Sequence, residues 1–125
     1  MKKLKIFGLS FILILILFNF KVIKVQGNSM YPTIKNNSYA IVDSYLHKLF
    51  TIQKNDILLF IVEGHEVVKK IVGFPGEKIE IEGKSISLEN NEIYVLGENP
   101  KESIDSRSYG PLKTSQIIGK VVLVF

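Results

Sequence analysis

A block of apolar residues near the N-terminus limits the folds open to this chain more than any other feature. The run from Ile6 to Phe20 holds only three residues that are not apolar, Gly8, Ser10 and Asn19, and lysines flank it on both sides. As a helix the run reaches about 22 Å, and further apolar residues extend it towards the roughly 30 Å of a bilayer core. Lysine side chains can carry their amines out of an apolar layer. We therefore predict that residues 1–25 form a transmembrane anchor.

Two other interpretations of this segment fit the residues less well. A cleaved signal peptide ends in small residues around the cut site, and the stretch KVIKVQGNSM offers no such site. A buried core helix would not be flanked by lysines at both ends. Because positive charge is slightly greater before the block, we predict a single-pass protein of the cell membrane with residues 26–125 outside the cytoplasm.

Beyond residue 26 the pattern changes to short runs rich in β-branched and aromatic residues. The runs are SYAIVDSYL, DILLFIV, EVVKKIVGF, KIEIEGKSISL, EIYVLG and IIGKVVLVF, with turn-forming residues between them. Strict alternation on both sides of Glu82-Gly83-Lys84 predicts a hairpin. The sequence thus predicts a mainly β fold, in which the anchor helix precedes a small domain of coiled antiparallel β-sheets.

Composition excludes several kinds of function. The 125 residues include no cysteine, so a disulfide scaffold and a cysteine-ligated metal site are both ruled out. The net charge of +4 comes from scattered lysines, without the basic stripe interleaved with aromatics that nucleic-acid binding favours. A mild positive charge beside an apolar block suits anionic lipid head groups. The sequence does not fix an oligomeric state.

The stretch QGNSMYPT places one serine directly after the apolar block. Ser29 lies between a Gly-Asn pair and a turn that contains proline, where a fixed backbone can present its hydroxyl. Taken alone, this is a turn serine. Its position within a few residues of the predicted anchor keeps it close to a membrane surface.

Two adjacent lysines interrupt an apolar strand. Lys69 and Lys70 lie within EVVKKIVGF, and neighbouring residues of a strand point to opposite faces. One lysine must face inward, where loss of solvation favours its neutral amine, and a neutral amine is a usable general base. Taken alone, the pair also fits two solvated lysines on an edge strand.

The stretch GENPKESIDSRSYG carries polar residues at alternating positions. Ser103, Asp105 and Arg107 would share one side of an extended chain. There the Asp–Arg pair could form a bidentate clamp, and Ser103 could hydrogen-bond an amine. Taken alone, the stretch is also compatible with a polar surface loop.

Together and in this order, these segments resemble the type I signal peptidases, the membrane-bound serine–lysine peptidases that remove signal peptides. The family's boxes correspond to SMYPT, QKNDILLF, KKIVGFPGE and GENPKESIDSRSYG, and its last strand to IIGKVVLVF. The resemblance covers nearly the whole chain. It implies a short form of the enzyme with an all-β catalytic domain of coiled antiparallel sheets.

The resemblance also implies a role for each matching residue. Ser29 matches the nucleophile and Lys69 the general base, whereas Lys70 matches a neighbouring arginine and should be exposed on the opposite face. Ser103 matches the serine that orients the lysine. The two residues that match the supporting ion pair are Asp105 and Arg107.

The implied activity is that of a serine endopeptidase. Neutral Lys69 takes the Ser29 proton, the hydroxyl attacks the scissile carbonyl, and an acyl-enzyme ester forms before hydrolysis. The resemblance implies signal peptides of secreted preproteins as substrates, cut after small residues. It implies a membrane lipid environment and requires no metal or cofactor.

Several positions depart from the family's pattern. Asn55 stands in place of a glycine, and Glu77 and Glu98 in place of aspartates. Residues 100–102 replace the usual Arg-Asp-Asn. These departures bear on the local conformation of the two turns and of the last box.

The oxyanion site also departs from some relatives. Gly27 stands where they have a serine whose hydroxyl helps to bind the oxyanion. The backbone N–H of Ser29 is then one expected donor. Asn28 is a candidate for the second.

Other functions remain open from the sequence. A Ser-His-Asp triad would need Ser29, an aspartate and either His65 or His47. The self-cleaving repressors also have a Ser-Lys dyad on a β core, but with a DNA-binding domain in place of an anchor. A specialised peptidase of the same superfamily, for conjugation or pilus processing, and an inactive membrane-tethered β module that binds peptides are further alternatives.

Overall fold

The computed structural model describes residues 1–44 and 52–125 of the chain. The helices are α1 (Lys2–Asn19), α2 (Ser106–Tyr109) and the short 3₁₀ helices η2 (Pro100–Glu102) and η3 (Thr114–Gln116). The strands are β1 (Phe20–Lys24), β2 (Tyr39–Asp43), β3 (Ile57–Val62), β4 (His65–Gly73), β5 (Lys78–Ile81), β6 (Lys84–Ser87), β7 (Glu92–Leu96), β8 (Leu112–Lys113) and β9 (Ile117–Val124).

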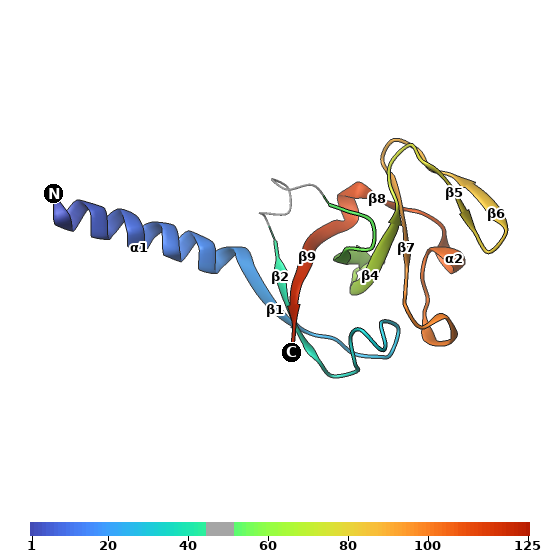
Figure 1. The fold of residues 1–125 in the computed structure, drawn as a ribbon, viewed down its shortest axis with the longest axis horizontal. Coiled ribbons are helices and arrows are strands. Elements are labelled where there is room, and N and C mark those ends of the chain that lie inside the picture. The colour runs from blue at the N-terminus through green and yellow to red at the C-terminus, as the bar shows by residue number, and fades with distance from the viewer. Residues whose placement is uncertain (45–51) are drawn as a thin grey trace.

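Helix α1 extends away from the β-structure (Figure 1), and its residues from Lys2 to Phe18 are exposed. In the described part of the chain, no helix has both the length and the apolar character that crossing a membrane requires. The prediction that the helical segment continues to residue 25 is wrong, because α1 ends at Asn19. Residues Phe20–Lys24 instead pair antiparallel with β2, from Phe20 opposite Asp43 to Lys24 opposite Tyr39.

The predicted antiparallel β fold is confirmed. A seven-stranded sheet has the order β1-β2-β9-β3-β4-β7-β8, and β5 and β6 form a separate hairpin at the end of the molecule remote from α1 (Figure 1). Five of the six apolar runs form one strand each, and the sixth, KIEIEGKSISL, forms the two strands of the predicted hairpin. The part of SYAIVDSYL beyond Ser44 lies outside the described residues.

The turn before β3 explains one departure noted in the sequence. Asn55 adopts a φ of 72°, a left-handed conformation that asparagine tolerates better than other side chains do. Its N–H donates to the carbonyl of Ile71 at 2.8 Å, which ties the turn to β4. Asparagine can therefore serve in this turn where the resembling family has glycine.

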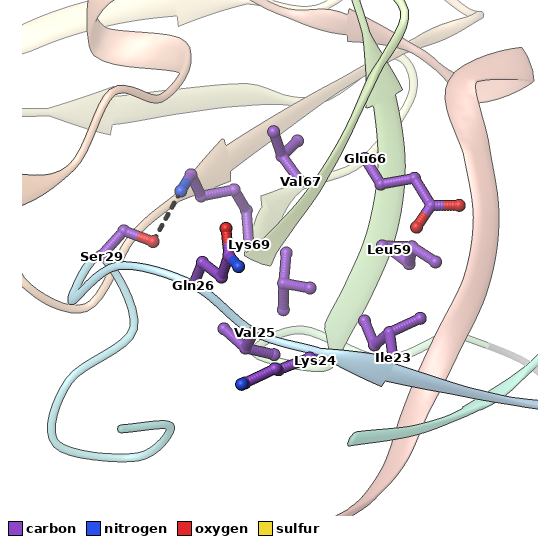
Figure 2. A pocket seen from close by; sticks show the side chains of 10 residues that line it. Ile23, Lys24, Val25, Gln26, Ser29, Leu59, Glu66, Val67 and Lys69 are labelled. Atoms are coloured by element: carbon purple, nitrogen blue, oxygen red, sulfur yellow. Dashed lines mark hydrogen bonds between the residues drawn. The ribbon is translucent and has the colours of Figure 1, made fainter. Parts of the chain in front are cut away.

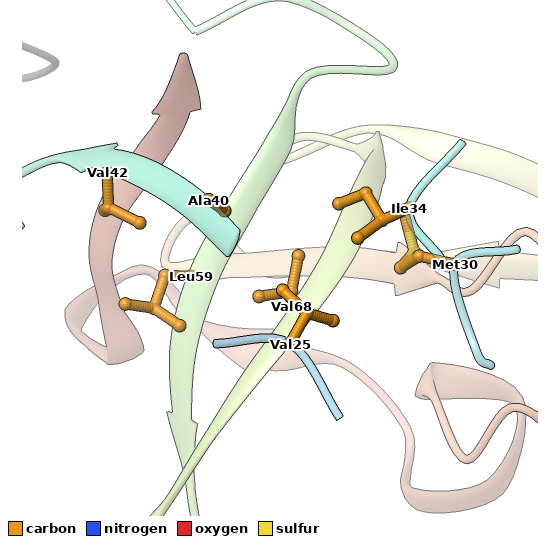
Figure 3. Packing of buried hydrophobic residues seen from close by; sticks show 7 residues of the cluster. All are labelled: Val25, Met30, Ile34, Ala40, Val42, Leu59 and Val68. Atoms are coloured by element: carbon orange, nitrogen blue, oxygen red, sulfur yellow. The ribbon is translucent and has the colours of Figure 1, made fainter. Parts of the chain in front are cut away.

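Buried side chains lie on both faces of the central strands because neighbouring strand residues alternate. Leu58 and Phe60 belong to one cluster, and Leu59 between them belongs to the other. The second cluster also takes in Met30 and Ile34, which are buried to 1% and 0% exposure and pack near Val68 (Figure 3). Burying side chains of this size is worth about 1.5–3 kcal/mol each, so the segment after Ser29 is firmly seated on the sheet.

Candidate active site

Ser29 and Lys69 meet beside β4, next to the point where its pairing with β7 begins. The Lys69 Nζ donates a hydrogen bond to the Ser29 Oγ at 2.9 Å (Figure 2). Lys69 comes from β4, where it lies opposite Leu58 of β3, and Ser29 comes from a turn that we call the Ser29 loop (residues 27–34). The predicted contact between these two side chains is present.

The surroundings of Lys69 favour its neutral amine. The residue is 6% exposed. Burial lowers the pKa of Lys69 below its ordinary value, and the negative charge of Asp105 opposes this shift only in part. A buried amine with a lowered pKa, hydrogen-bonded to a serine hydroxyl, has the properties of a general base beside a nucleophile.

Lys70 does not lie where the sequence led us to expect. It was predicted to be exposed, yet its side chain is only 27% exposed and lies beside Glu98, with Nζ 3.8 Å from Oε1. Strand alternation correctly gave Lys69 and Lys70 different surroundings. It could not reveal that the segment after β7 covers the outward face at this point.

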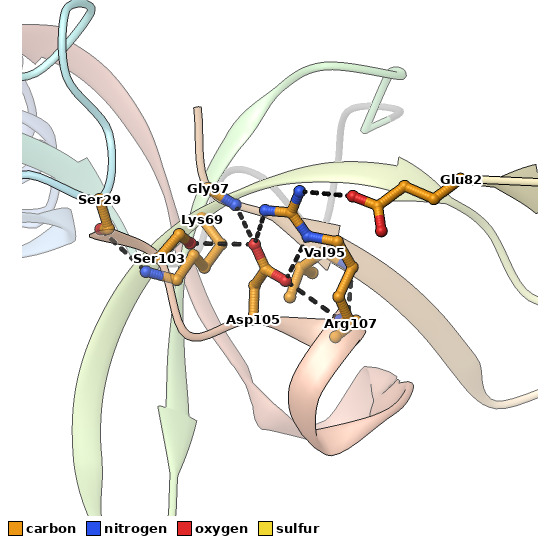
Figure 4. Close-up of polar contacts among 9 residues, drawn as sticks. Ser29, Lys69, Glu82, Val95, Gly97, Ser103, Asp105 and Arg107 are labelled. Atoms are coloured by element: carbon orange, nitrogen blue, oxygen red, sulfur yellow. Dashed lines mark hydrogen bonds and ion pairs between the residues drawn. The ribbon is translucent and has the colours of Figure 1, made fainter. Parts of the chain in front are cut away.

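Asp105 lies at the centre of a hydrogen-bond network (Figure 4). Arg107 donates to both of its carboxylate oxygens, from Nε at 3.0 Å and from a terminal nitrogen at 2.7 Å. The Gly97 N–H and the Ser103 hydroxyl each donate to Oδ2 at 2.9 Å. Burial alone would raise the pKa of Asp105, but the hydrogen bonds from Arg107, Gly97 and Ser103 hold it below the ordinary value.

The ion pair forms through a helix start, contrary to the extended chain predicted here. Asp105 caps the N-terminus of α2, where its carboxylate accepts from the Arg107 N–H at 3.1 Å. Arg107 in the first turn then folds back onto that carboxylate. A second link comes from Ser106, whose hydroxyl accepts from the Val95 N–H of β7 at 3.0 Å.

Ser103 stands beside the Ser29–Lys69 pair. Its hydroxyl proton goes to Asp105, which leaves the oxygen's lone pairs as acceptors. A Cβ at Gly97 would lie 2.0 Å from Ser103 Oγ and 2.7 Å from the Ser29 carbonyl, so both residues crowd the same point. A hydrogen bond from the Lys69 amine to the Ser103 oxygen stays a prediction.

A groove of about 420 Å³ leads to the pair (Figure 2). Residues 23–26 form one wall, residues 66–69 form the other, and Leu59 and Ser29 complete it. Sequence reasoning missed the first wall because residues 23–25 were assigned to the anchor. The alternation of Ile23 and Val25 with polar Lys24 and Gln26 was the signal that could have identified an extended segment.

Both walls present unpaired strand edges, as far as the described residues go. On one side β4 pairs with β3 from His65 to Lys70, but on the other it pairs with β7 only from Lys70 onward. β1 pairs with β2 alone. Backbone groups along the groove are therefore available to a further extended chain.

The predicted oxyanion donors, the Ser29 N–H and Asn28, lie in the turn that carries Ser29. Within the described residues, no hydrogen bond uses the backbone N–H of Ser29, and the groove-lining residues include Gln26 but not Asn28. The Asn28 carbonyl accepts from the Tyr31 N–H at 3.1 Å, which closes the turn. Asn28 as the second donor stays a prediction.

His65, one of the two alternative histidine bases, is not the partner of Ser29. His65 begins β4 and is exposed, whereas the Ser29 hydroxyl has Lys69 as its partner. His47 lies outside the described residues. Over residues 1–44 and 52–125, no group of three or more histidine and acidic side chains is placed to hold a metal ion.

Comparison with known proteins points to one family. The chain matches the family model described as "Signal peptidase, peptidase S26" over residues 2–92 and 83–125. It is 26% identical over 136 residues to "Signal peptidase I V" of Bacillus subtilis, covering 78% of this chain and 81% of that protein. It is 29% identical over 143 residues to "Signal peptidase I" of Bacillus caldolyticus, with 84% and 79% covered.

A further relative comes from an organelle. "Mitochondrial inner membrane protease subunit 1" of Xenopus tropicalis is 30% identical over 112 residues, covering 82% of this chain and 67% of that protein. The matches span the segments that carry the Ser29–Lys69 contact and the Asp105 network.

Proposed function

The chain belongs to the peptidase S26 family of signal peptidases, and from this premise we propose that it cleaves the signal peptides of secreted preproteins with a Ser29–Lys69 dyad. The observation that carries the proposal is the 2.9 Å hydrogen bond between the buried Lys69 amine and the Ser29 hydroxyl. Ser29 is the nucleophile and Lys69 is the general base.

The reaction proceeds in two halves. Neutral Lys69 accepts the Ser29 proton as Oγ bonds to the scissile carbonyl carbon. When the intermediate collapses, the C–N bond breaks, the lysine ammonium gives its proton to the leaving amine, and an ester on Ser29 remains. Lys69 then takes a proton from water, the resulting hydroxide attacks the ester, and Ser29 recovers its proton.

The Asp105 network keeps the base in place. Asp105 fixes Ser103 and Gly97 through hydrogen bonds of 2.9 Å, and both residues border Ser29. Ser103 then offers its oxygen to the Lys69 amine and restricts the amine's rotation. Arg107 neutralises the Asp105 carboxylate, which limits how far that charge raises the pKa of Lys69.

The substrate binds as an extended strand in the groove. The unpaired edges beside residues 23–26 and 66–69 supply backbone partners, a mode known as β-augmentation. Apolar Val25, Leu59 and Val68 line the groove and favour small apolar side chains before the cut. The Ser29 N–H binds the oxyanion, with Asn28 as a candidate for the second donor.

Helix α1 holds this domain at a membrane. Its large apolar side chains are exposed, as with Phe7 at 73% and Phe18 at 80%, and residues 6–19 carry no charge. Such a surface is unfavourable in water, and α1 leads directly through β1 into the groove wall. The groove then opens towards the lipid from which a signal peptide emerges, on the extracytoplasmic side.

The membrane proposal has its own test. The protein should float with liposomes, whereas a Leu13→Asp, Ile14→Asp variant should remain in the dense fraction. Protease added to intact spheroplasts should digest the β domain. Complete protection of the domain there would overturn the proposed orientation.

The catalytic proposal is tested with Ser29→Ala. Purified wild type should cut a preprotein once, after its signal peptide, as mass spectrometry of the products would show. Ser29→Ala should leave the preprotein intact while melting like wild type, and the exposed control Ser87→Ala should cleave normally. Cleavage by folded Ser29→Ala at a near-normal rate would reject Ser29 as nucleophile.

A further inference from the structure

We propose that Glu98 is a positioning residue whose carboxylate ties the Ser29 loop to β4 and so fixes the separation of the two members of the dyad. This inference rests on the proposed function for its catalytic consequence. The contacts themselves do not depend on it. Glu98 is one of the positions at which the sequence departs from the resembling family.

Glu98 contacts both chain segments that carry the dyad. Its Oε2 accepts a hydrogen bond from the Thr33 hydroxyl, near the end of the Ser29 loop. Its Oε1 lies 3.8 Å from the Nζ of Lys70, the residue directly after Lys69 in β4. A single carboxylate thus joins the loop of Ser29 to the strand of Lys69.

The carboxylate of Glu98 and the amine of Lys70 are partly shielded from water, whereas Thr33 is exposed. The side chains of Glu98 and Lys70 are only 19% and 27% exposed. Exposed ion pairs contribute little because water screens them and both side chains lose freedom. A partly covered carboxylate that also accepts a hydroxyl proton forms a charge-assisted hydrogen bond, which is shorter and stronger.

Lys69 and Lys70 hold the Ser29 loop from different faces of β4. Lys69 reaches Ser29 directly, whereas Lys70 reaches Thr33 through Glu98. Adjacent strand residues point to opposite faces, so the loop is held from two directions. A loop held from two directions cannot rotate about the Ser29–Lys69 hydrogen bond.

The backbone around Glu98 is itself anchored. The preceding Gly97 N–H donates to Asp105 at 2.9 Å, and the following Asn99 N–H donates to the Ser29 carbonyl at 2.9 Å. Glu98 therefore projects from a fixed segment. The backbone of this segment binds Ser29, and the Glu98 side chain binds Thr33 near the other end of the Ser29 loop.

The length of the glutamate side chain matters to this role. One carboxylate oxygen must reach Thr33 and the other must approach Lys70. An aspartate is one methylene shorter and could keep one contact only by giving up the other. The Glu98→Asp variant should therefore lie between wild type and Glu98→Ala.

The test compares kcat and KM for signal-peptide cleavage in four variants. Misplacing a catalytic group by about 1 Å can cost about 100-fold in rate. We expect Glu98→Ala to lower kcat by about 10- to 100-fold with KM changed less than about threefold, and Thr33→Val to reproduce most of this loss. Lys70→Met should lose less than about tenfold, since the Thr33 contact remains.

Glu102→Gln is the matched control. It lies in the same segment, is exposed, and its carboxylate contacts the Asn99 side chain rather than the Ser29 loop. Its kcat should stay within about twofold of wild type. Glu98→Gln, which keeps an acceptor for Thr33, should retain more activity than Glu98→Ala and serves if the alanine variant folds poorly.

The double variant Glu98→Ala, Thr33→Val tests most sharply whether Thr33 and Glu98 act together. If Thr33 acts through Glu98, then Thr33→Val adds no loss to Glu98→Ala. If the losses in kcat of the two single variants instead multiply in the double variant, the proposal is overturned. A folded Glu98→Ala enzyme with wild-type kcat would overturn it too, as would an equal loss of kcat in Glu102→Gln.

Amide hydrogen exchange separates this inference from the proposed function. Exchange at Ile34, whose N–H donates to the Met30 carbonyl at 2.8 Å, reports on the Ser29 loop whether or not the protein cleaves anything. We expect faster exchange there in Glu98→Ala and not in Glu102→Gln. If wild type cleaves no signal peptide, the proposed function fails, and unchanged exchange would overturn the Glu98 role independently.

Discussion

The Lys69 Nζ lies 2.9 Å from the Ser29 Oγ, and this contact joins positions 40 residues apart in the chain. It depends on two different supports. The buried side chains of Met30 and Ile34 anchor the loop that carries Ser29, and the pairing of β4 with β3 fixes Lys69. The chemistry proposed for this protein follows from the contact together with the burial of the amine.

The rate of cleavage should rise with pH. In the proposed mechanism the active form needs neutral Lys69, and burial places the pKa of this lysine below the ordinary value. The rate should therefore increase as pH rises through the folded-state pKa, and level off on the alkaline side. Measuring kcat from about pH 6 to about pH 10 on one peptide checks this, since a lysine base titrates in that range. A rate that falls steadily across the range would contradict a lysine base.

Burial of Lys69 should also make the stability of the protein depend on pH, in a direction that follows from the lowered pKa. Because the folded-state pKa of Lys69 is lowered, folded protein binds fewer protons than unfolded protein between the two pKa values. The cost of burying the ammonium is full below the folded pKa and disappears as pH approaches the unfolded value. Lys69→Met should therefore be at least as stable as wild type at neutral pH, with an advantage that shrinks at alkaline pH.

Urea unfolding at two pH values measures this difference. Lys84→Met, which changes an exposed lysine of the β5–β6 hairpin, is the control and should show no such pH-dependent gain. A Lys69→Met protein much less stable than wild type at neutral pH would show that the ammonium is not penalised by burial.

Removing the Asp105 side chain should strongly destabilise the protein. Its side chain is 1% exposed and paired with Arg107, and breaking a buried pair by removing one partner costs about 3–5 kcal/mol. Asp105→Ala should lower the free energy of unfolding by about this amount. Glu82→Gln removes the exposed partner of Arg107, at 68% exposure, and should cost no more than about 1 kcal/mol.

We also expect the carboxylate of Asp105 to make the stability of the protein sensitive to acid. The pKa of Asp105 is lowered in the folded protein, so its contribution is present above the unfolded value and is lost as pH falls through the folded value. Wild type should lose stability on acidification, and Asp105→Ala should lose less. Parallel acid titrations of the two proteins would contradict this assignment.

Gly97 should not tolerate alanine. The added Cβ would lie 2.0 Å from Ser103 Oγ and 2.7 Å from the Ser29 carbonyl, and a backbone oxygen cannot rotate away. We expect Gly97→Ala to cost about 1–3 kcal/mol of stability and most of the activity. Gly8→Ala meets nothing within 4 Å and is the control, read by thermal melts and kcat. A Gly97→Ala enzyme with wild-type kcat would show that Ser29 and Ser103 need not be so close.

Much of the fold followed from local pattern. Alternating apolar residues between turn signals predicted strands β2 to β7 and β9, because strand periodicity and turn chemistry are both local. Strand β1 was missed because its apolar residues continue the run of α1 without a turn signal. Its pairing with β2 is a tertiary effect that no local pattern records.

The sequence predicted the residues of the site and the Ser29–Lys69 contact, but not their surroundings. Resemblance supplied Ser29 and Lys69, and alternation predicted that one lysine faces inward. The covering of Lys70 by Glu98 and the groove between residues 23–26 and 66–69 depend on segments distant in sequence. Such contacts arise only when the sheet has formed.

The most direct test of the account is preprotein cleavage by Lys69→Met, measured beside wild type and Lys70→Met at equal folded concentration in detergent. Methionine keeps an unbranched side chain, one heavy atom shorter than that of lysine, and removes the amine. The account predicts no measurable cleavage by Lys69→Met, a melt no lower than that of wild type near neutral pH, and substantial residual cleavage by Lys70→Met. A Lys69→Met enzyme that cleaves at a near-normal rate would contradict the serine–lysine dyad and make His65 the next base to test.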